Sequence, residues 1–131
     1  MLLKRLLLAL YFVLFTGITT LFSQKLFYPK SEKTCTLKAD NSDFDFCYEK
    51  TGTIGSFVLT KNTIQYFGLI EDILYNIEKV TVKNSQYTYL CTYNDNKKAL
   101  ITADSKLTKV SVYKNNNKTR YVSIYKSILI D

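Results

Sequence analysis

Short runs in which apolar and polar residues alternate, separated by polar turns, recur along the chain from residue 33 onward. Successive side chains of a strand point to opposite faces, so alternation of this kind is typical of half-buried β-strands. Tyr, Phe, Val, Ile and Thr, which favour strands, fill most of these runs. The pattern predicts about nine strands. They cover residues 33–38, 44–48, 57–60, 64–67, 73–83, 87–93, 99–102, 107–113 and 120–130.

Short polar segments, such as Asn84-Ser85 and residues 94–97, connect these runs. Parallel strands need a crossover of a dozen or more residues, whereas antiparallel strands join through short hairpins. We therefore predict an all-β fold, a small antiparallel up-and-down meander that forms a barrel or a sandwich. Both architectures share the period of two, so the pattern leaves the choice between them open.

Residues 65–78 also fit a different element. Tyr66, Ile70, Ile73 and Ile77 follow the spacing of one helix face, and a helix here would change the class to α+β. Gly68 opposes the helix, and the adjacent Glu71 and Asp72 also suit the tip of a hairpin. The helix near 65–78 is kept as an alternative.

The first 23 residues differ from the rest of the chain. A basic start with Lys4 and Arg5 leads into ten apolar residues, 6–15, and then into a small-residue tail that ends at Ser23. This order is typical of a secretory signal peptide. We predict a signal peptide at 1–23 and a single small β-rich domain at 24–131.

A membrane anchor is the alternative for this segment. Thr16, Gly17, Thr19 and Thr20 interrupt its apolar character, and a spanning helix usually needs about 20 apolar residues. We therefore expect a secreted or periplasmic protein with no stable membrane span after cleavage.

Export changes how the three cysteines are interpreted, because disulfides form in oxidising compartments. Cys35 and Cys47 lie almost symmetrically about Asn41, so a hairpin turning at 39–43 would place them opposite each other. We predict a Cys35–Cys47 disulfide and a Cys91 that packs as a small apolar residue. A Cys47–Cys91 bridge between distant strands is the competing pairing.

The net charge of +7 becomes +5 once Lys4 and Arg5 are removed, and Arg120 is then the sole arginine. Arginine is preferred for bidentate phosphate recognition, so a lysine excess suits solvated strand faces better than a nucleic-acid groove. Tyrosines alternate with other residues in 87–93, and tyrosines and lysines are interspersed with polar residues in 113–125, as on barrels that bind single-stranded nucleic acid. Export argues against that partner, and we predict no nucleic acid.

The chain contains no histidine, which excludes Cys-His and Ser-His-Asp catalysis and histidine-ligated zinc. We predict no cofactor and no metal. Carboxylates remain as candidates for hydrolytic chemistry. They are Asp45, Glu49, Glu71, Asp72, Glu78 and Asp104.

These exclusions favour an exported non-enzymatic binding module that takes a small apolar ligand or a protein partner, in the manner of an inhibitor or neutralising protein. A small carboxylate-dependent hydrolase is one alternative. An envelope or surface structural protein that adds a partner strand to an exposed edge at 121–130 is the other. The predicted binding surface comprises Tyr87, Tyr89, Tyr93, Tyr113, Tyr121 and Tyr125. The side chains predicted to point inward are Phe44, Phe46, Phe57, Leu59, Tyr89, Val110, Val112 and Ile124.

Overall fold

The computed structural model describes residues 3–7, 24–38, 44–52, 55–115 and 120–126. Residues 3–7 form a short helix, and the other described residues lie almost entirely in strands and the turns between them. The strands are β1 (Lys25–Phe27), β2 (Ser31–Leu37), β3 (Phe44–Thr51), β4 (Ser56–Leu59), β5 (Thr63–Phe67), β6 (Asp72–Lys83), β7 (Gln86–Tyr93), β8 (Lys97–Asp104), β9 (Lys109–Asn115) and β10 (Arg120–Lys126).

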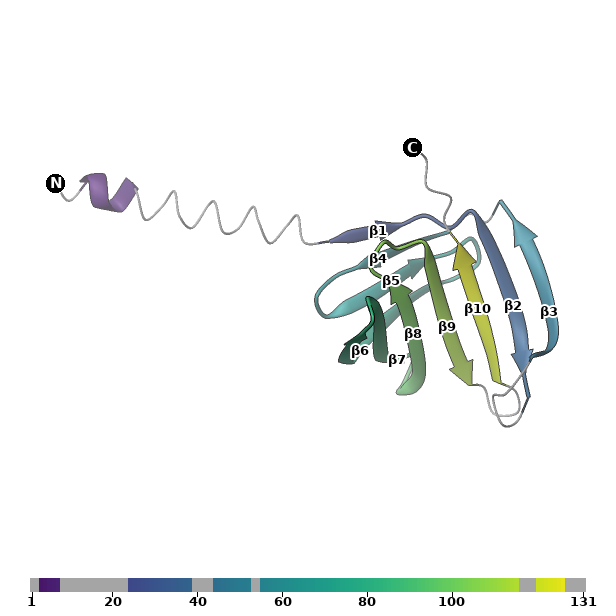
Figure 1. Cartoon of the computed structure of the whole chain (residues 1–131). Coiled ribbons are helices and arrows are strands. Elements are labelled where there is room, and N and C mark those ends of the chain that lie inside the picture. The colour runs from purple at the N-terminus through teal and green to yellow at the C-terminus, as the bar shows by residue number, and fades with distance from the viewer. Residues whose placement is uncertain (1–2, 8–23, 39–43, 53–54, 116–119, 127–131) are drawn as a thin grey trace.

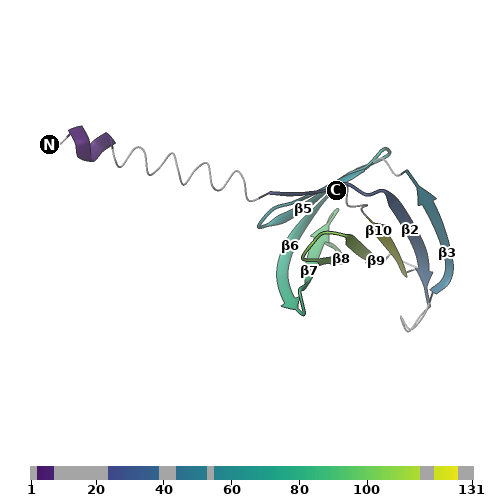
Figure 2. The same ribbon diagram turned by 45° about the horizontal axis from the view of Figure 1, so that its top comes forward.

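All ten described strands belong to one antiparallel sheet in the order β1-β4-β5-β6-β7-β8-β9-β10-β2-β3. The run from β4 to β10 is the predicted meander, in which each strand pairs with the next along the chain (Figure 1). The sheet curls strongly, and Figure 2 shows it as an arch that runs from β6 round to β3. The predicted all-β class is confirmed, as a curled half-barrel.

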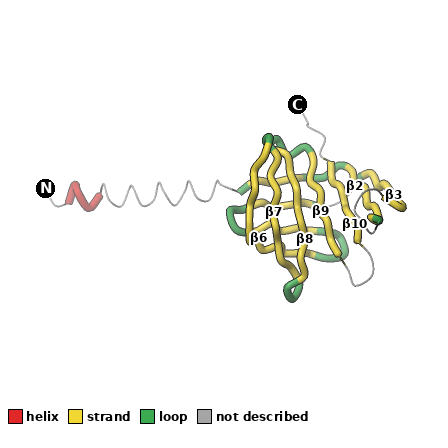
Figure 3. Tube along the Cα trace, turned by 60° about the horizontal axis from the view of Figure 1, so that its bottom comes forward, coloured by secondary structure: helices red, strands yellow, loops and turns green. Residues whose placement is uncertain are grey.

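A long bent hairpin produces this curl. One arm is β1 followed by β2, the other is β3 followed by β4, and the arms pair as β1 with β4 and β2 with β3. β1 leads into β2 across residues 28–30, and β3 leads into β4 across residues 52–55, so the two ends of the sheet are joined through the chain itself. The Lys30 N–H donates to the Lys126 carbonyl at 2.7 Å, and the Gly52 N–H donates to the Lys30 carbonyl at 3.0 Å. Gly52 has a φ of +69°, which glycine adopts without strain. In Figure 3 the strands β6 to β10 lie side by side across the curved sheet.

The alternative helix near 65–78 is wrong, because β5 and β6 pair across this segment. The Gly68 N–H donates to the Glu71 carbonyl at 3.0 Å, which closes a tight turn between the strands. Ile70, which matched the helical spacing, lies in that turn and is 99 % exposed. Ile73 and Tyr75 instead follow the strand period and are buried.

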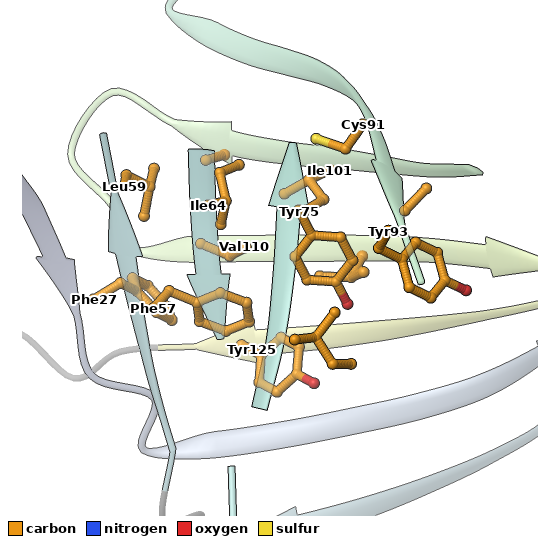
Figure 4. Packing of buried hydrophobic residues seen from close by; sticks show 14 residues of the cluster. Phe27, Phe57, Leu59, Ile64, Tyr75, Cys91, Tyr93, Ile101, Val110 and Tyr125 are labelled. Atoms are coloured by element: carbon orange, nitrogen blue, oxygen red, sulfur yellow. The ribbon is translucent and has the colours of Figure 1, made fainter. Parts of the chain in front are cut away.

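The buried hydrophobic cluster lies on the concave face of the sheet (Figure 4). It consists of Phe27, Phe57, Leu59, Ile64, Ile73, Tyr75, Cys91, Tyr93, Ala99, Ile101, Ala103, Val110, Val112 and Tyr125. Phe27 comes from β1, a strand that the sequence pattern did not predict. Because side chains alternate between the two faces of a strand, most strands contribute every second side chain to this cluster.

The predicted inward set is correct in part. Phe57, Leu59, Val110 and Val112 belong to the buried hydrophobic cluster, and Tyr89 packs against it. Phe46 is 69 % exposed, because β3 extends beyond the part of the sheet that folds over the cluster. Ile124 lies on the convex face, since it alternates with the buried Tyr125. The side chain of Phe44 lies outside the described residues.

The C-terminal strand is not a sheet edge. β10 pairs with β9 on one side and with β2 on the other, so the predicted free edge at 121–130 is wrong over the described residues of that range, 121–126. Among the described strands, the free edge at this end of the sheet belongs to β3 instead.

Cys35 and Cys47 form the predicted disulfide. They are register partners in the β2–β3 hairpin, with their Cα atoms 4.1 Å apart. Cys91 is free and buried, and it lies on the concave face, whereas Cys35 pairs with Val122 on the convex face. The competing Cys47–Cys91 pairing is therefore wrong, because the two side chains lie on opposite faces of the sheet.

The predicted signal peptide at 1–23 falls largely outside the described residues. Within the described ranges, no helix has the length and apolar character that crossing a membrane requires.

Candidate functional site: a cavity on the concave face

Five of the six predicted surface tyrosines lie on the concave face. Tyr93 and Tyr125 are buried in the hydrophobic cluster, while Tyr87 and Tyr89 stack beside it with ring centroids 6.2 Å apart. Tyr121 lies on the same face of β10 as Tyr125. Tyr113 instead pairs with Leu100 and Val122 on the convex face, so the predicted tyrosine surface is divided between two sides.

A cavity of about 330 Å³ opens on the concave face beside the buried cluster. One wall comes from β2 and β10, and the opposite wall is the β5–β6 turn at residues 68–71. Lys50 and Lys114 contribute from β3 and β9. These elements are distant in sequence, and the curl of the sheet brings them together (Figure 1).

The β2–β10 wall carries a chain of hydrogen bonds. Thr34 Oγ1 donates to the Glu32 carboxylate at 3.3 Å, and Ser123 Oγ lies 3.2 Å from Thr34 Oγ1. Since the Thr34 proton is directed at Glu32, Ser123 acts as the donor to Thr34. The Tyr125 hydroxyl also hydrogen-bonds Glu32, its register partner across the two strands. The wall is thus polar and already organised.

Aromatic rings form the floor next to this wall. The Tyr125 ring lies 4.8 Å from the Phe57 ring in an edge-on arrangement (Figure 4). The Tyr66 ring lies 5.8 Å from the Tyr125 ring. Such arrangements stabilise aromatic pairs beyond the area that they bury. Burial, followed by the nearby Glu32 carboxylate, raises the pKa of Tyr125 far above its usual value. Tyr125 is therefore a neutral hydrogen-bond donor at neutral pH.

Lys114 brings a positive charge to the cavity. Its Nζ lies 5.5 Å from the centroid of the Tyr75 ring and 5.4 Å from that of Tyr93, within the range of cation–π attraction. Burial lowers the pKa of Lys114, although the carboxylates of Glu71 and Glu32 oppose the shift.

The mouth of the cavity is apolar. Leu69 and Ile70, in the β5–β6 turn, are 69 % and 99 % exposed. The cavity therefore combines a polar wall, an aromatic floor, a cation and an apolar rim, which are the features expected of a ligand site.

Two other hollows of the described surface offer less. A groove of about 410 Å³ on the convex face runs between Leu37, Leu90, Leu100 and Tyr113, and a hollow of about 440 Å³ lies at the loops around Ser85 and Lys106. The residues of the hydrogen-bonded wall and of the aromatic floor line neither of these two hollows. We take the concave cavity as the candidate site.

The carboxylates predicted for hydrolysis are mostly scattered. Glu71 lines the cavity, together with Glu32, which was not among the predicted carboxylates. Glu49 and Asp72 are exposed on strands, and Glu78 lies at a register shift of β6. The side chain of Asp45 lies outside the described residues. Glu32 and Lys114 were missed because nothing in the local sequence distinguishes them from solvated strand residues.

Asp104 has a structural role. Burial pushes the pKa of Asp104 upward, but hydrogen bonds from the Thr108 hydroxyl and from the backbone N–H groups of Lys109 and Thr108 outweigh it and lower the pKa. These N–H groups lie 3.0 and 2.7 Å from Oδ1, so Asp104 fixes the β8–β9 turn.

Cys91 is a poor nucleophile. Burial raises the pKa of its thiol to about 11, and the nearby Glu78 adds to the shift. The thiol therefore keeps its proton at neutral pH, while catalysis requires the thiolate.

Raising the pH above about 10 is expected to unfold the protein. Burial raises the pKa of six tyrosines in the folded state, namely Tyr66, Tyr75, Tyr89, Tyr93, Tyr121 and Tyr125. The unfolded chain loses these protons near pH 10 and the folded chain at higher pH, so the folded state binds more protons and its stability falls as the pH rises. The contribution is intact below pH 10.

Lys114 has the opposite effect on stability, because its pKa is lowered in the folded state. Just below pH 10.5 the unfolded state binds this proton more readily than the folded state, so this contribution to stability rises with pH. Lys114 is one group against the six tyrosines and Cys91, whose raised pKa also lowers stability as the pH rises. The measurement is the denaturant midpoint at a series of pH values, with tyrosinate absorbance recorded in parallel. Tyr75→Phe should make the alkaline decline shallower. Stability that is constant across this range would contradict the burial of these rings.

No protein-family model matches the chain, and no curated protein or solved structure is significantly similar to it.

Proposed function

We propose that the protein is an exported, non-enzymatic binding module that holds a small ligand in the cavity on the concave face. The observation that carries this proposal is the convergence of a polar wall, a ring floor and a half-buried lysine in one open cavity. A volume of about 330 Å³ falls in the range of small-molecule sites.

The organisation of the wall supports binding. Ser123, Thr34 and Tyr125 are held by hydrogen bonds that converge on Glu32. A ligand that enters meets side chains that are already ordered, so it loses little affinity to their immobilisation.

Export is supported by two independent features. The pattern of residues 1–23 is that of a signal peptide, and the Cys35–Cys47 disulfide suits an oxidising compartment. The disulfide also ties β2, which carries Glu32 and Thr34, to the free-edge strand β3.

The test is native mass spectrometry of protein purified from its own exported fraction without reducing agent. We expect the mass of residues 24–131 less two hydrogens, together with an additional bound small molecule. Ser123→Leu fills the cavity from its buried wall and should remove the additional mass. Thr92→Leu, on the convex face of β7, should retain it.

A bare monomer, or a co-purifying protein in place of a small molecule, would contradict the proposal. The second outcome would favour a docking role through exposed surface such as the free edge of β3.

A carboxylate-dependent hydrolase is the second candidate, because Glu32 and Glu71 line the same cavity. Hydrolysis of aryl glycosides that is abolished by Glu71→Gln would favour it. Glu32 argues for binding instead, since its carboxylate is occupied by hydrogen bonds from Thr34 and Tyr125.

A further inference from the structure

The ammonium group of Lys114 has an unusual setting. The side chain extends from β9 on the concave face and places Nζ over the rings of Tyr75, from β6, and Tyr93, from β7. Figure 4 shows these two rings side by side within the buried cluster. Lysine at such a depth loses hydration, which penalises its charged form.

The protein does little to compensate this charge. Within the described part of the chain, no carboxylate lies within ion-pair distance of Lys114 Nζ, and Glu71 and Glu32 act on it only from farther away. Glu32 is moreover engaged by Thr34 and Tyr125. The faces of the two tyrosine rings supply part of the missing compensation, while a bound anion would supply the rest.

Apolar surface lies in the same cavity. Leu69 and Ile70 project from the β5–β6 turn at its mouth, largely exposed, and the rings of Tyr66 and Tyr125 line the interior. Apolar side chains that adjoin polar groups in one cavity provide the apolar contacts of a small-molecule site. The cation and the apolar rim belong to one site, so its ligand should carry both complementary features.

We propose that the cavity binds a small amphipathic anion, a molecule with one acidic group on an apolar body, whose acidic group contacts Lys114 Nζ and whose body packs against Leu69 and Ile70. This proposal rests on the proposed function and specifies its ligand class. Lys50, which also lines the cavity, adds to the preference for an anion. The two lysines offset the formal charges of Glu32 and Glu71, but the Glu32 carboxylate is already engaged by hydrogen bonds, whereas the Lys114 ammonium contacts, among the described residues, only the faces of two tyrosine rings. The preference for an anion therefore rests on the Lys114 ammonium and not on the net charge of the cavity.

Two fluorescent probes that share one ring system test the proposal. 1-Anilinonaphthalene-8-sulfonate carries an acidic group, and N-phenyl-1-naphthylamine is its uncharged counterpart. The folded protein should bind the sulfonate at least about ten-fold more tightly, as one charge-assisted contact implies. Lys114→Met should abolish this preference and leave binding of the neutral probe within about two-fold, since the apolar contacts remain. Lys114→Arg keeps the charge and should retain the preference.

Two further variants locate the effect. Lys98→Met removes a lysine from the convex groove and should change neither probe, whereas Ser123→Leu should weaken both. Circular dichroism verifies that each variant is folded. Equal affinity for the two probes, an equal loss in Lys98→Met and Lys114→Met, or sulfonate binding unaffected by Ser123→Leu would overturn the proposed ligand class. The proposed function fails separately if neither probe binds the folded protein.

Discussion

Replacing Ile101 by alanine is expected to lower the free energy of unfolding by about 2–5 kcal/mol. Ile101 is fully buried at the centre of β8, where Tyr89 and Val112 are its register partners on the concave face. Truncation removes apolar contact and leaves a void that a closely packed interior refills only in part. The measurement is the urea midpoint of the oxidised protein.

The adjacent Leu100 provides the matched control. It lies in the same strand but points to the convex face, where it is 37 % exposed. Leu100→Ala should cost about 1 kcal/mol or less, because the side chain already contacts water. Equal losses for the two variants would contradict the assignment of the concave face as the core.

Removing the disulfide is expected to have the second-largest effect. Cys35→Ser combined with Cys47→Ser should lower the free energy of unfolding by about 2–3 kcal/mol in the chain-entropy model. The bond links residues 12 apart in the β2–β3 hairpin, and among the described strands β3 has a neighbour on one side only. Cys35 is itself buried beside Val122, so the substitution also places a hydroxyl in an apolar position.

Thiol titration provides the control for this comparison. The unfolded, unreduced protein should show one reactive thiol, from Cys91, and the reduced protein three. The midpoint of the reduced wild type should lie between those of the oxidised protein and the double variant, because only the variant places a hydroxyl at the buried position 35. Three thiols without a reductant, or an unchanged midpoint in the double variant, would count against the bond as a source of stability.

Local pattern was sufficient to predict most of the strands. Alternation identified β2 to β10, and the polar residues between them fixed several hairpins. Asn84 and Ser85 adopt φ values of 51° and 60° in the two-residue turn between β6 and β7, where asparagine tolerates this conformation well. The spacing of Cys35 and Cys47 about Asn41 likewise predicted a contact within a single hairpin.

The candidate site was predictable only in fragments. Tyr87, Tyr89 and Tyr93 share a face because an even number of residues separates them in one strand, which the period of two already implies. Whether Tyr113 joined Tyr121 and Tyr125 depended on the β9–β10 register, and a shift of one residue reverses the face of every side chain. The register places Tyr113 on the convex side.

By itself, therefore, the sequence favoured the all-β class, the meander and the Cys35–Cys47 disulfide over the helix near 65–78 and the Cys47–Cys91 pairing, because each of these depends on neighbours along the chain. Tertiary structure alone decided the pairing of β1 with β4 and of β2 with β10, which bends the sheet into a curl. That curl brings Glu32, Lys114 and the β5–β6 turn into one cavity. The period of two specifies which face a side chain occupies but not which distant strand lies beside it, so the site could emerge only from the long-range pairing.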